Sequence, residues 1–459
     1  MNLDTIVALS TGEGGAIAVV RLSGSDAIAI TDKIFRSAKS VAISAMQGYT
    51  TAYGTIVDLN GDTIDEVVVA LFRAPNSYTS EDVIEISCHA SSYIEQKIIG
   101  QLVDLGARPA CPGEFTQRAY INGKLDLVQA EAVADIIASS SAASHRMAIS
   151  QMKGNYSKEF KKLRDELLHL ASLLELELDF SEEDVEFADR TKLKELLSAI
   201  IYKITGLIGS FKQGNAIKNG VPTAIVGSPN VGKSTLLNVL VKDDRAIVSS
   251  IAGTTRDTIE ECITIGGILF RFIDTAGIRR TTDTIESLGI ERTFQKITKA
   301  ALILLVIDPS SQDYMAQIEQ ISPTKDQELL VVINKTDLIN KQNLLELQTQ
   351  IETNTPYKTF PIEAKSSIGI SALEDHISKE YTKFLSSESI TINNIRHIDL
   401  LTKALSSAQR AQNALSTSTP TDLIAADTRQ TITHISSIIG EITTTDILTN
   451  IFSHFCIGK

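Results

Sequence analysis

The chain contains a glycine-rich stretch whose residue types and spacing suit the binding of a nucleotide phosphate. Gly227-Ser-Pro-Asn-Val-Gly-Lys-Ser234 follows the apolar run Pro222–Val226 and leads into Thr235–Leu240, which has helical spacing. In this context backbone N–H groups point at the β- and γ-phosphates, Lys233 adds a positive charge and Ser234 offers a hydroxyl to Mg2+. A chance match would not usually have a strand before the loop and a helix after it, so we expect a nucleotide site.

A second stretch, Asp274-Thr-Ala-Gly277, closes the apolar run Ile268–Ile273. Asp274 can hold Mg2+ through a water molecule, and the amide of Gly277 can meet the γ-phosphate. Ile278 follows, at the position where Ras-like GTPases place the glutamine that orients the attacking water. Because isoleucine cannot hydrogen-bond that water, either another group holds it or hydrolysis is slow.

A third stretch, Asn334-Lys-Thr-Asp337, closes another apolar run and indicates guanine. The Asp337 carboxylate can accept both N–H donors on the edge of guanine, a pair that adenine lacks. Asn334 and Lys335 are expected to shape the pocket around the base. Glu363-Ala-Lys365 follows the last strand and suits the final base contact, although Glu replaces the more usual Ser.

The segment Ser249–Thr255 is expected to close over Mg2+ through a threonine when the γ-phosphate is present. The expected Mg2+ ligands are Ser234 and Thr255. The residues expected to contact the nucleotide or its cations are Asn230, Val231, Gly232, Lys233, Ser234, Thr235, Ser249, Ser250, Ile251, Ala252, Gly253, Thr254, Thr255, Asp274, Thr275, Ala276, Gly277, Asn334, Lys335, Asp337, Ala364 and Lys365.

The composition is that of an ordinary soluble chain, with 43% hydrophobic and 22% charged residues among 459, enough for about two to four domains. It has no apolar run of about eighteen residues and no basic start followed by an apolar segment, so neither a membrane helix nor a secretory signal is expected. The four cysteines lack C-x-x-C pairing, which favours reduced thiols in the cytoplasm. The net charge of −13 argues against a chain that coats nucleic acid, but it allows a local basic patch.

The elements that must position the motifs change in type along the chain. Up to about residue 120, short β-type runs mix with stretches of helical spacing, which predicts an α+β unit. The expected strands include Ala16–Val20, Val67–Phe72 and Val83–Ser87, and the expected helices are Ser25–Phe35 and Ser92–Leu105.

On either side of the nucleotide motifs, apolar residues recur every three or four positions, which predicts long helices. An acidic loop at Phe180–Glu186 interrupts them, and the polar stretch Phe211–Val221, with two glycines, is interpreted as a domain junction. The expected helical stretches are Leu125–Ile137, His145–Leu178, Leu193–Phe211 and Ile395–Phe455.

Between the helical parts, residues 216–383 alternate strands and helices. The near-continuous apolar runs Ile268–Ile273, Ala301–Ile307 and Glu328–Ile333 are typical of parallel strands covered on both faces. The simplest architecture inserts a Ras-like α/β P-loop GTPase domain into an all-α domain. The expected domains are an α+β N-terminal domain at 1–122, a discontinuous helical domain at 123–215 plus 384–459, and the inserted GTPase domain at 216–383.

Three features together resemble the tRNA-uridine modification GTPases of the TrmE/MnmE type. They are Gly253-Thr-Thr-Arg-Asp257, the apolar Ile278, and the C-terminal Phe455-Cys-Ile-Gly-Lys459. The resemblance covers essentially the whole chain, including the domain order. The C-terminal motif is the most specific of the three, because a generic GTPase has no need of it.

The resemblance implies activation by K+. Asn230 would be a side-chain ligand of this cation, which can stabilise transition-state charge as an arginine finger does. Further ligands, largely backbone oxygens, would come from Ser249, Ile251 and Thr254. Glu286 matches the family's catalytic glutamate, which acts on the hydrolytic water in place of the missing glutamine. The less favoured alternative is a solvated helix residue.

The resemblance also implies that the N-terminal domain binds a reduced folate and mediates dimerisation. Arg21, Glu81, Lys124 and the terminal Lys459 match the family's contacts to formyl-tetrahydrofolate. Arg and Lys suit the glutamyl carboxylates of a folate, and a carboxylate suits the N–H edge of the pterin. From their chemistry alone these four would be ordinary surface charges. Ser80 departs from the family pattern, which has Gly there, and so adds a side chain near the pocket.

Two further features have open interpretations. Cys456 can be a nucleophile or an acid, or a small apolar filler as buried cysteines often are; with Lys233 and Glu286 it completes the expected catalytic residues. A basic run can touch tRNA phosphates or be a solvated helix face, and it consists of Lys153, Lys158, Lys161, Lys162 and Arg164.

By resemblance, GTP hydrolysis in a homodimer drives a domain movement that assists modification of carbon 5 of the wobble uridine in certain tRNAs. The one-carbon source would be 5-formyl- or 5,10-methylenetetrahydrofolate. An FAD- and NADH-dependent partner protein would complete the active site and give aminomethyl or carboxymethylaminomethyl uridine. The alternative is a ribosome-assembly or regulatory GTPase switch without substrate chemistry, which shares every GTPase motif.

Overall fold

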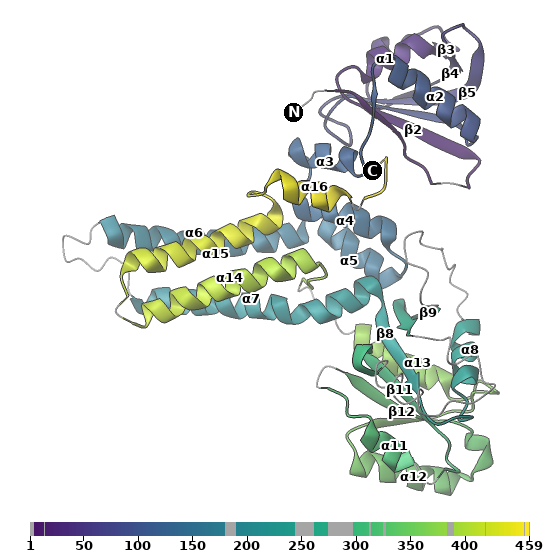
Figure 1. The fold of residues 1–459 in the computed structure, drawn as a ribbon, viewed down its shortest axis with the longest axis vertical. Coiled ribbons are helices and arrows are strands. Elements are labelled where there is room, and N and C mark those ends of the chain that lie inside the picture. Colours follow the sequence, from purple (N-terminus) through teal and green to yellow (C-terminus); the bar gives the residue numbers. More distant parts are fainter. Residues whose placement is uncertain are drawn as a thin grey trace. The chain divides into compact units, whose positions relative to one another are not determined.

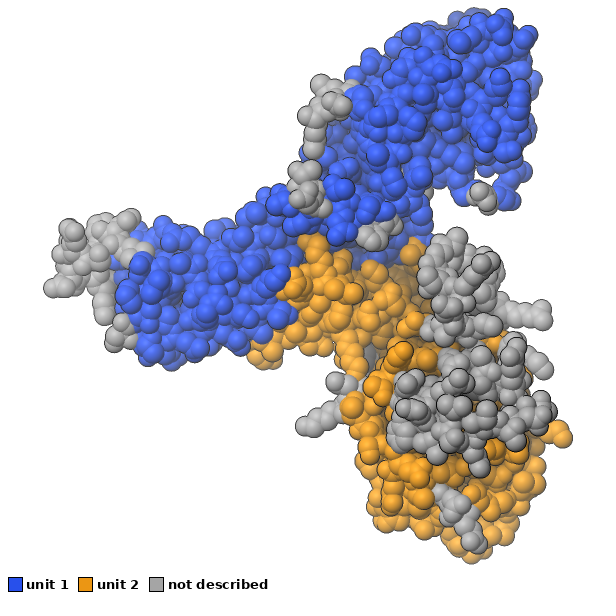
Figure 2. Space-filling view, viewed as in Figure 1, with its two compact units in different colours: residues 1–137, 148–201, 400–459 blue, residues 138–147, 202–399 orange. Residues whose placement is uncertain are grey.

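The computed structural model describes residues 4–12, 14–179, 190–243, 261–273, 297–311, 314–324, 327–382, 390–417, 419–453 and 455–458. The chain forms two compact units (Figure 2). Unit 1 comprises Met1–Ile137, Ala148–Ile201 and Leu400–Lys459, and unit 2 comprises Ala138–Met147 and Tyr202–Asp399.

The amino-terminal part of unit 1 is built on a seven-stranded sheet with the order β3-β4-β5-β6-β2-β1-β7 (Figure 1). All neighbouring strands are antiparallel except β1 and β7. The strands are β1 (Ile6–Leu9), β2 (Ile17–Ser23), β3 (Phe35–Ser37), β4 (Thr50–Val57), β5 (Thr63–Phe72), β6 (Val83–His89) and β7 (Arg108–Pro109).

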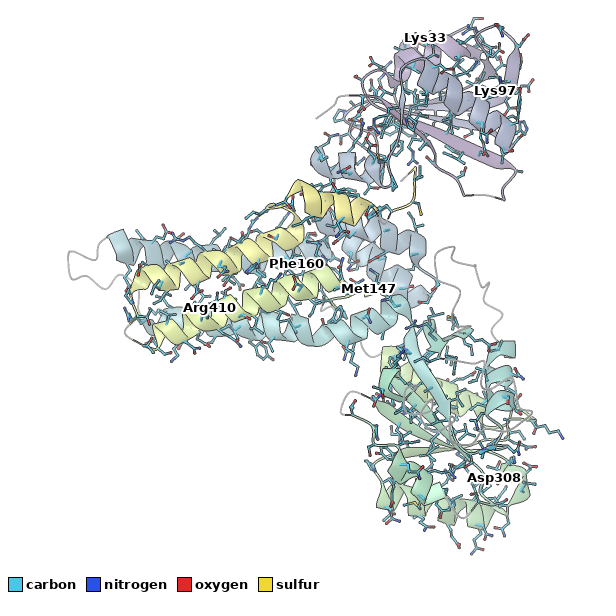
Figure 3. All side chains as sticks on the ribbon, viewed as in Figure 1. Lys33, Lys97, Met147, Phe160, Asp308 and Arg410 are labelled. Carbon is cyan, nitrogen blue, oxygen red and sulfur yellow. The ribbon has the colours of Figure 1, made fainter. Side chains whose placement is uncertain are left out.

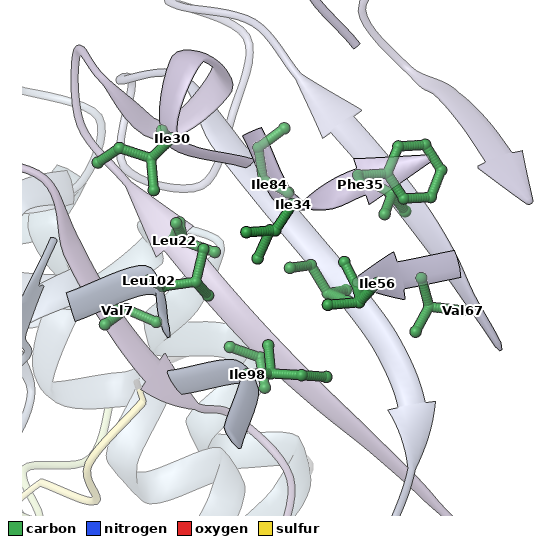
Figure 4. Close-up of a cluster of buried hydrophobic side chains, with 14 of the residues drawn as sticks. Val7, Leu22, Ile30, Ile34, Phe35, Ile56, Val67, Ile84, Ile98 and Leu102 are labelled. Carbon is green, nitrogen blue, oxygen red and sulfur yellow. The ribbon is translucent and has the colours of Figure 1, made fainter. Parts of the chain in front are cut away.

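Alternating burial along the strands gives this sheet one apolar face. In β5, Asp65, Val67 and Val69 are buried, whereas Glu66 and Val68 between them are exposed. Helices α1 (Ala27–Ile34) and α2 (Ser92–Asp104) cover the apolar face, and their side chains share one core with the strands (Figure 4). The predicted α+β unit is thereby confirmed.

The rest of unit 1 is helical. Side chains of α6, α7, α14 and α15 share an apolar core that includes Leu174, Leu197 and Ala411. Phe160 of α6 is fully buried, whereas Arg410 of α14 is exposed and pairs with Asp427 of α15 (Figure 3). The helices that lie wholly or partly in unit 1 are α3 (Glu114–Ile121), α4 (Leu127–Ala138), α5 (Ala142–Met152), α6 (Asn155–Asp179), α7 (Arg190–Asn219), α14 (Ile395–Leu415), α15 (Thr421–Ile439) and α16 (Thr445–Ser453).

Three details differ from the expected helices. The stretch Ile395–Phe455 is divided into α14, α15 and α16. The stretch His145–Leu178 is broken at Gly154, whose φ of +79° lies in the left-handed region that ends α5 before α6 begins. The stretch 211–221, expected as a polar junction, is helical up to Asn219. Its Gly214 allows a close approach, since a Cβ there would lie 2.1 Å from the Ile392 carbonyl oxygen. The predicted acidic loop at 180–186 lies outside the described residues.

Unit 2 contains a six-stranded sheet with the order β13-β12-β11-β8-β10-β9. Its strands are parallel except β9, which runs antiparallel to β10 at the edge. Every residue of β11 is buried, as predicted for a strand covered on both faces. The strands are β8 (Val221–Val226), β9 (Glu261–Ile265), β10 (Ile268–Phe272), β11 (Leu302–Ile307), β12 (Glu328–Ile333) and β13 (Lys358–Pro361).

Helices cover the sheet of unit 2. Ile318 of α11 and Ile351 of α12 share a core with Ile303 and Leu305 of β11, while α13 packs on β9 and β10. These helices are α8 (Lys233–Asp243), α11 (Tyr314–Gln320), α12 (Lys341–Asn354) and α13 (Ile370–Thr382). The predicted α/β class is confirmed. Within the described part of the chain, no helix combines the length and apolarity needed to cross a membrane.

Candidate functional site

The phosphate loop joins the end of β8 to the start of α8 and needs its two glycines. Gly227 has a φ of +144° and Gly232 a φ of +99°. A Cβ on Gly227 would lie 2.1 Å from the carbonyl oxygen of Val306, so β11 leaves no room for a side chain there. Helix α8 begins immediately, with the Leu236 amide donating to the Gly232 carbonyl. The loop therefore presents a helix N-terminus to a bound anion.

Lys233 folds back over this loop. Its Nζ donates to the carbonyl oxygens of Gly227 at 2.8 Å and Ser228 at 2.6 Å. A phosphate bound in the loop would replace these neutral acceptors with charged ones, which form stronger hydrogen bonds. Ser234 and Thr235 follow in the first turn of α8, where a hydroxyl can reach a cation beside the phosphates.

Asn334 connects the phosphate loop to the loop after β13. Its side chain is 3% exposed; Nδ2 donates to the Val231 carbonyl at 2.8 Å, and Oδ1 accepts from the Ala364 amide at 3.0 Å. A Cβ on Gly232 would lie 2.1 Å from Asn334 Nδ2. Both functional ends of the amide are thus used to hold these two loops together.

Lys335 has a partner that the sequence did not reveal. Its Nζ lies 2.8 Å from Oδ2 of Asp308, the residue that follows β11. Burial disfavours the charged form of Asp308, but the hydrogen bonds from Lys335 and Ser310 outweigh it and lower its pKa. Asp308 follows an apolar strand, as Asn334 does, and that position was the signal that could have identified it.

The predicted base contacts lie along one edge of the sheet. Asp337 is exposed in a short 3-10 turn after β12, and Lys365 is exposed after β13, next to the buried Ala364. Because β8, β11, β12 and β13 are parallel, the loops at their carboxyl ends gather at that edge, where such sheets bind ligands. Asn230 is exposed on the phosphate loop with a φ of +63°.

Several predicted site residues lie outside the described residues, and the structure says nothing of them. They are Ser249, Ser250, Ile251, Ala252, Gly253, Thr254, Thr255, Asp274, Thr275, Ala276, Gly277, Glu286 and Lys459.

In unit 1, the carboxy-terminal tail, defined here as Phe455–Gly458, lies against the amino-terminal domain. The Gly113 amide donates to the Cys456 carbonyl at 3.3 Å, and Ser10 Oγ donates to the Gly458 carbonyl at 3.3 Å. Phe455 is buried beside Phe452, with ring centroids 5.3 Å apart. The Cys456 side chain is exposed, so its interpretation as a buried apolar filler is wrong.

Arg21 lies beside this tail and is not an ordinary surface charge. Its side chain is 16% exposed, and its guanidinium carbon lies 5.6 Å from the ring centroids of both Tyr78 and Phe115. Nε donates to Glu85 Oε1 at 2.9 Å, and Nη2 lies 2.8 Å from the same oxygen. Nη1 donates to the Gly458 carbonyl at 3.2 Å. The guanidinium is therefore fixed in orientation beside Gly458 of the tail.

The segment Ser77–Glu81 brings the other predicted folate residues near Arg21. Glu81 Oε2 accepts from Ser23 Oγ at 2.6 Å, and Lys124 Nζ donates to the Ser77 carbonyl. Arg21 meets the same segment through the ring of Tyr78. The structure thus brings Arg21, Glu81 and Lys124 together at the segment Ser77–Glu81.

Ser80, in the same segment, has a φ of +63°. This left-handed conformation is the one in which Gly costs least, which explains why a glycine suits the position. In the basic run, Lys153, Lys158, Lys161 and Lys162 are exposed, which fits both of its interpretations.

Comparisons with known proteins match the whole chain. A family model described as "GTP-binding protein TrmE N-terminus" matches residues 5–124, and one described as "MnmE helical domain" matches residues 127–456. A protein of Bacteroides thetaiotaomicron named tRNA modification GTPase MnmE is 52% identical over 475 residues, covering 100% of both chains. One of the same name from Flavobacterium johnsoniae is 50% identical over 469 residues, again covering 100% of both. The chain therefore belongs to the MnmE (TrmE) family.

Proposed function

We propose that this protein is a GTP hydrolase that takes part in tRNA modification, acting at carbon 5 of the wobble uridine. The observation that carries the proposal is its 52% identity, over the full length of both chains, to a protein named tRNA modification GTPase MnmE. The carboxyl edge of the sheet in unit 2 supports the GTPase part, because it gathers a glycine cradle, a lysine and an exposed aspartate in the order that guanine nucleotides require.

In this proposal Asp337 reads guanine and Lys233 neutralises the phosphates. Mg2+ is held by Ser234 and Thr255, and Glu286 acts on the hydrolytic water. The exposed Asn230, on the rim of the phosphate loop, suits a K+ ligand because its side-chain oxygen is a neutral acceptor. Further K+ ligands come from Ser249, Ile251 and Thr254. The cation would supply positive charge to the transition state.

The amino-terminal domain binds a reduced folate as one-carbon donor, with Arg21, Glu81, Lys124 and Lys459 as contacts. Support comes from the clustering of the first three around Ser77–Glu81 and from the tail lying beside Arg21. A partly buried carboxylate near two cations matches a ligand with pterin N–H donors at one end and carboxylates at the other.

The protein acts as a cytoplasmic homodimer with an FAD- and NADH-dependent partner protein, and tRNA is the substrate. We assign residues 1–122 to folate binding and dimerisation, 123–215 plus 384–459 to the helical domain, and 216–383 to GTP hydrolysis. Cys456, with its exposed thiol, is available for chemistry at the tail.

Equilibrium binding of 5-formyltetrahydrofolate to the full chain tests this function against a regulatory GTPase switch. The proposal expects saturable binding of one ligand per chain, in the absence and presence of GTP. A full chain that hydrolyses GTP but binds no reduced folate would favour the switch.

A further inference from the structure

Arg118 of α3 carries a partly buried charge that the proposed function does not use. Its side chain is 10% exposed. Its Nη1 donates to the Asp4 backbone carbonyl at 2.8 Å, and its Nη2 donates to the Asp4 carboxylate at 2.9 Å and to Glu114 at 3.1 Å. Asp4 and Glu114 therefore hold the guanidinium in place independently of its contact with Glu81.

The remaining contact of Arg118 holds the Glu81 carboxylate. Nη1 lies 3.3 Å from Oε1 and 3.1 Å from Oε2, so both oxygens face the same guanidinium nitrogen. Ser23 Oγ fixes Oε2 from a second direction at 2.6 Å, and Ser23 is itself fully buried. The Glu81 side chain remains 23% exposed, which leaves part of the carboxylate open to a ligand.

Two arginines lie in this cluster, and Arg118 is the one that pairs with Glu81. Arg108 pairs with Asp4 and Glu114, and no ion pair between Arg108 and Glu81 occurs among the described residues. Arg118 pairs with all three carboxylates. Burial lowers the pKa of Arg118, but Glu81 and Glu114 raise it by more, so the guanidinium stays charged.

We propose that Arg118 is a positioning residue for reduced-folate binding, which orients Glu81 so that its carboxylate accepts the 2-amino and ring N–H donors of the pterin. This inference rests on the folate binding of the proposed function. A carboxylate recognises a paired N–H edge best when its plane is fixed. Here the guanidinium of Arg118, on α3, fixes the plane of the Glu81 carboxylate. Arg118 itself does not contact the ligand in this arrangement.

The test compares two ligands and two arginines in the full chain by titration calorimetry. The ligands are 5-formyltetrahydrofolate and its analogue without the 2-amino group. In Arg118→Gln, affinity for the parent folate should fall roughly 10- to 100-fold, the size expected when a charged hydrogen bond is lost. Affinity for the analogue should fall by a clearly smaller factor, because one of the two donors that Glu81 accepts is already missing. Arg118→Lys should recover part of the parent's affinity.

Arg108→Gln is the matched control, since it removes a guanidinium from Asp4 and Glu114 but leaves the Glu81 contact in place. It should change both affinities by less than about threefold. If Arg118→Gln fails to fold, the Arg118→Lys change is measured in wild-type and Glu81→Gln backgrounds. An effect on parent affinity that disappears in the Glu81→Gln background supports action through Glu81.

The outcomes separate the two proposals. If the wild-type chain binds neither ligand, the folate part of the proposed function fails. If the wild-type chain binds the parent and Arg118→Gln binds it equally well, Arg118 does not position Glu81. Equal losses for parent and analogue would assign Arg118 a structural role only and would overturn the inference.

Discussion

The carbonyl oxygen of Gly458 accepts a hydrogen bond from Nη1 of Arg21 at 3.2 Å, across a separation of 437 residues. Gly458 has a φ of +89°, and a Cβ there would lie 2.1 Å from the Leu9 carbonyl oxygen. Only glycine combines that conformation with that approach. The tail is thus held against β1 and β2 of the amino-terminal domain, next to the proposed folate residues.

Replacing Gly458 with Ala should release the tail from Arg21. The new Cβ would clash with Leu9, and an alanine with positive φ costs about 1–2 kcal/mol. Reduced-folate affinity should fall roughly tenfold or more, with GTP affinity unchanged. Carboxypeptidase should remove C-terminal residues faster than in the wild type. Gly61→Ala is the control, because Gly61 has a φ of +91° but nothing within 4 Å of its Cβ position. If Gly458→Ala left both folate binding and the carboxypeptidase rate unchanged, the claim that Gly458 holds the tail against Arg21 would be refuted.

Replacing Gly232 with Ala should abolish GTP binding. Its Cβ would lie 2.1 Å from Asn334 Nδ2 and would break the link from the phosphate loop to Ala364. We expect a loss of at least about 100-fold in nucleotide affinity, measured with a fluorescent GTP analogue. Gly209→Ala, in α7 with nothing within 4 Å of its Cβ position, should leave affinity unchanged and stabilise by about 0.5–1 kcal/mol. Near-normal GTP binding by Gly232→Ala would contradict the described loop.

Replacing Asp337 with Asn should move nucleotide preference from guanine toward xanthine. The amide presents a donor where the carboxylate accepts two N–H groups, and xanthine has a carbonyl oxygen in place of the 2-amino group. The ratio of GTP to XTP affinity should fall by roughly 100-fold or more. Competition binding measures it, and an unchanged GTP preference would remove Asp337 from the base contact.

Replacing Ser80 with Gly should stabilise the amino-terminal domain. The left-handed φ of +63° costs a serine about 1–2 kcal/mol, and a glycine avoids that cost. In return, a glycine makes the unfolded chain more flexible, which lowers the free energy of unfolding by about 0.4–1 kcal/mol. The net gain is about 0.5–1 kcal/mol in the free energy of unfolding, followed by urea titration. Ser40→Gly, at an exposed position with a φ of +56°, is the matched control and should gain a similar amount. A destabilised Ser80→Gly would show that the serine side chain makes a compensating contact.

Acid should loosen the contacts of Asp4 and Glu114 as the pH falls below about 4. The hydrogen bond from Arg108 lowers the pKa of Asp4; for Glu114, burial opposes ionisation but Arg108 and other donors still lower its pKa. A lowered folded-state pKa contributes stability above the unfolded value, near 4, and that stability is lost as pH falls through the folded-state pKa. Hydrogen exchange of peptides from β1 and α3 should therefore accelerate below about pH 4, beyond the intrinsic change. In Glu114→Gln this acceleration should be smaller, and an equal acceleration would exclude Glu114 as a cause.

The sequence predicted local features well and distant contacts poorly. The all-buried strand Leu302–Ile307 and the glycine loop at Gly227 follow from residue type and spacing alone. The pairs Lys335–Asp308 and Arg118–Glu81 do not, because no spacing rule links a charge to a partner 27 or 37 residues away. The helical continuation through Gly214 was also missed, since it depends on packing against Ile392.

The most direct test of the central claim is nucleoside mass spectrometry of tRNA from a bacterial strain that lacks its own member of this family and expresses this chain. We predict that aminomethyl or carboxymethylaminomethyl groups return to carbon 5 of the wobble uridine, and that Gly232→Ala, which cannot bind GTP, fails to restore them. Unmodified wobble uridine in the strain that expresses the wild-type chain, with the protein present and hydrolysing GTP, would contradict the claim.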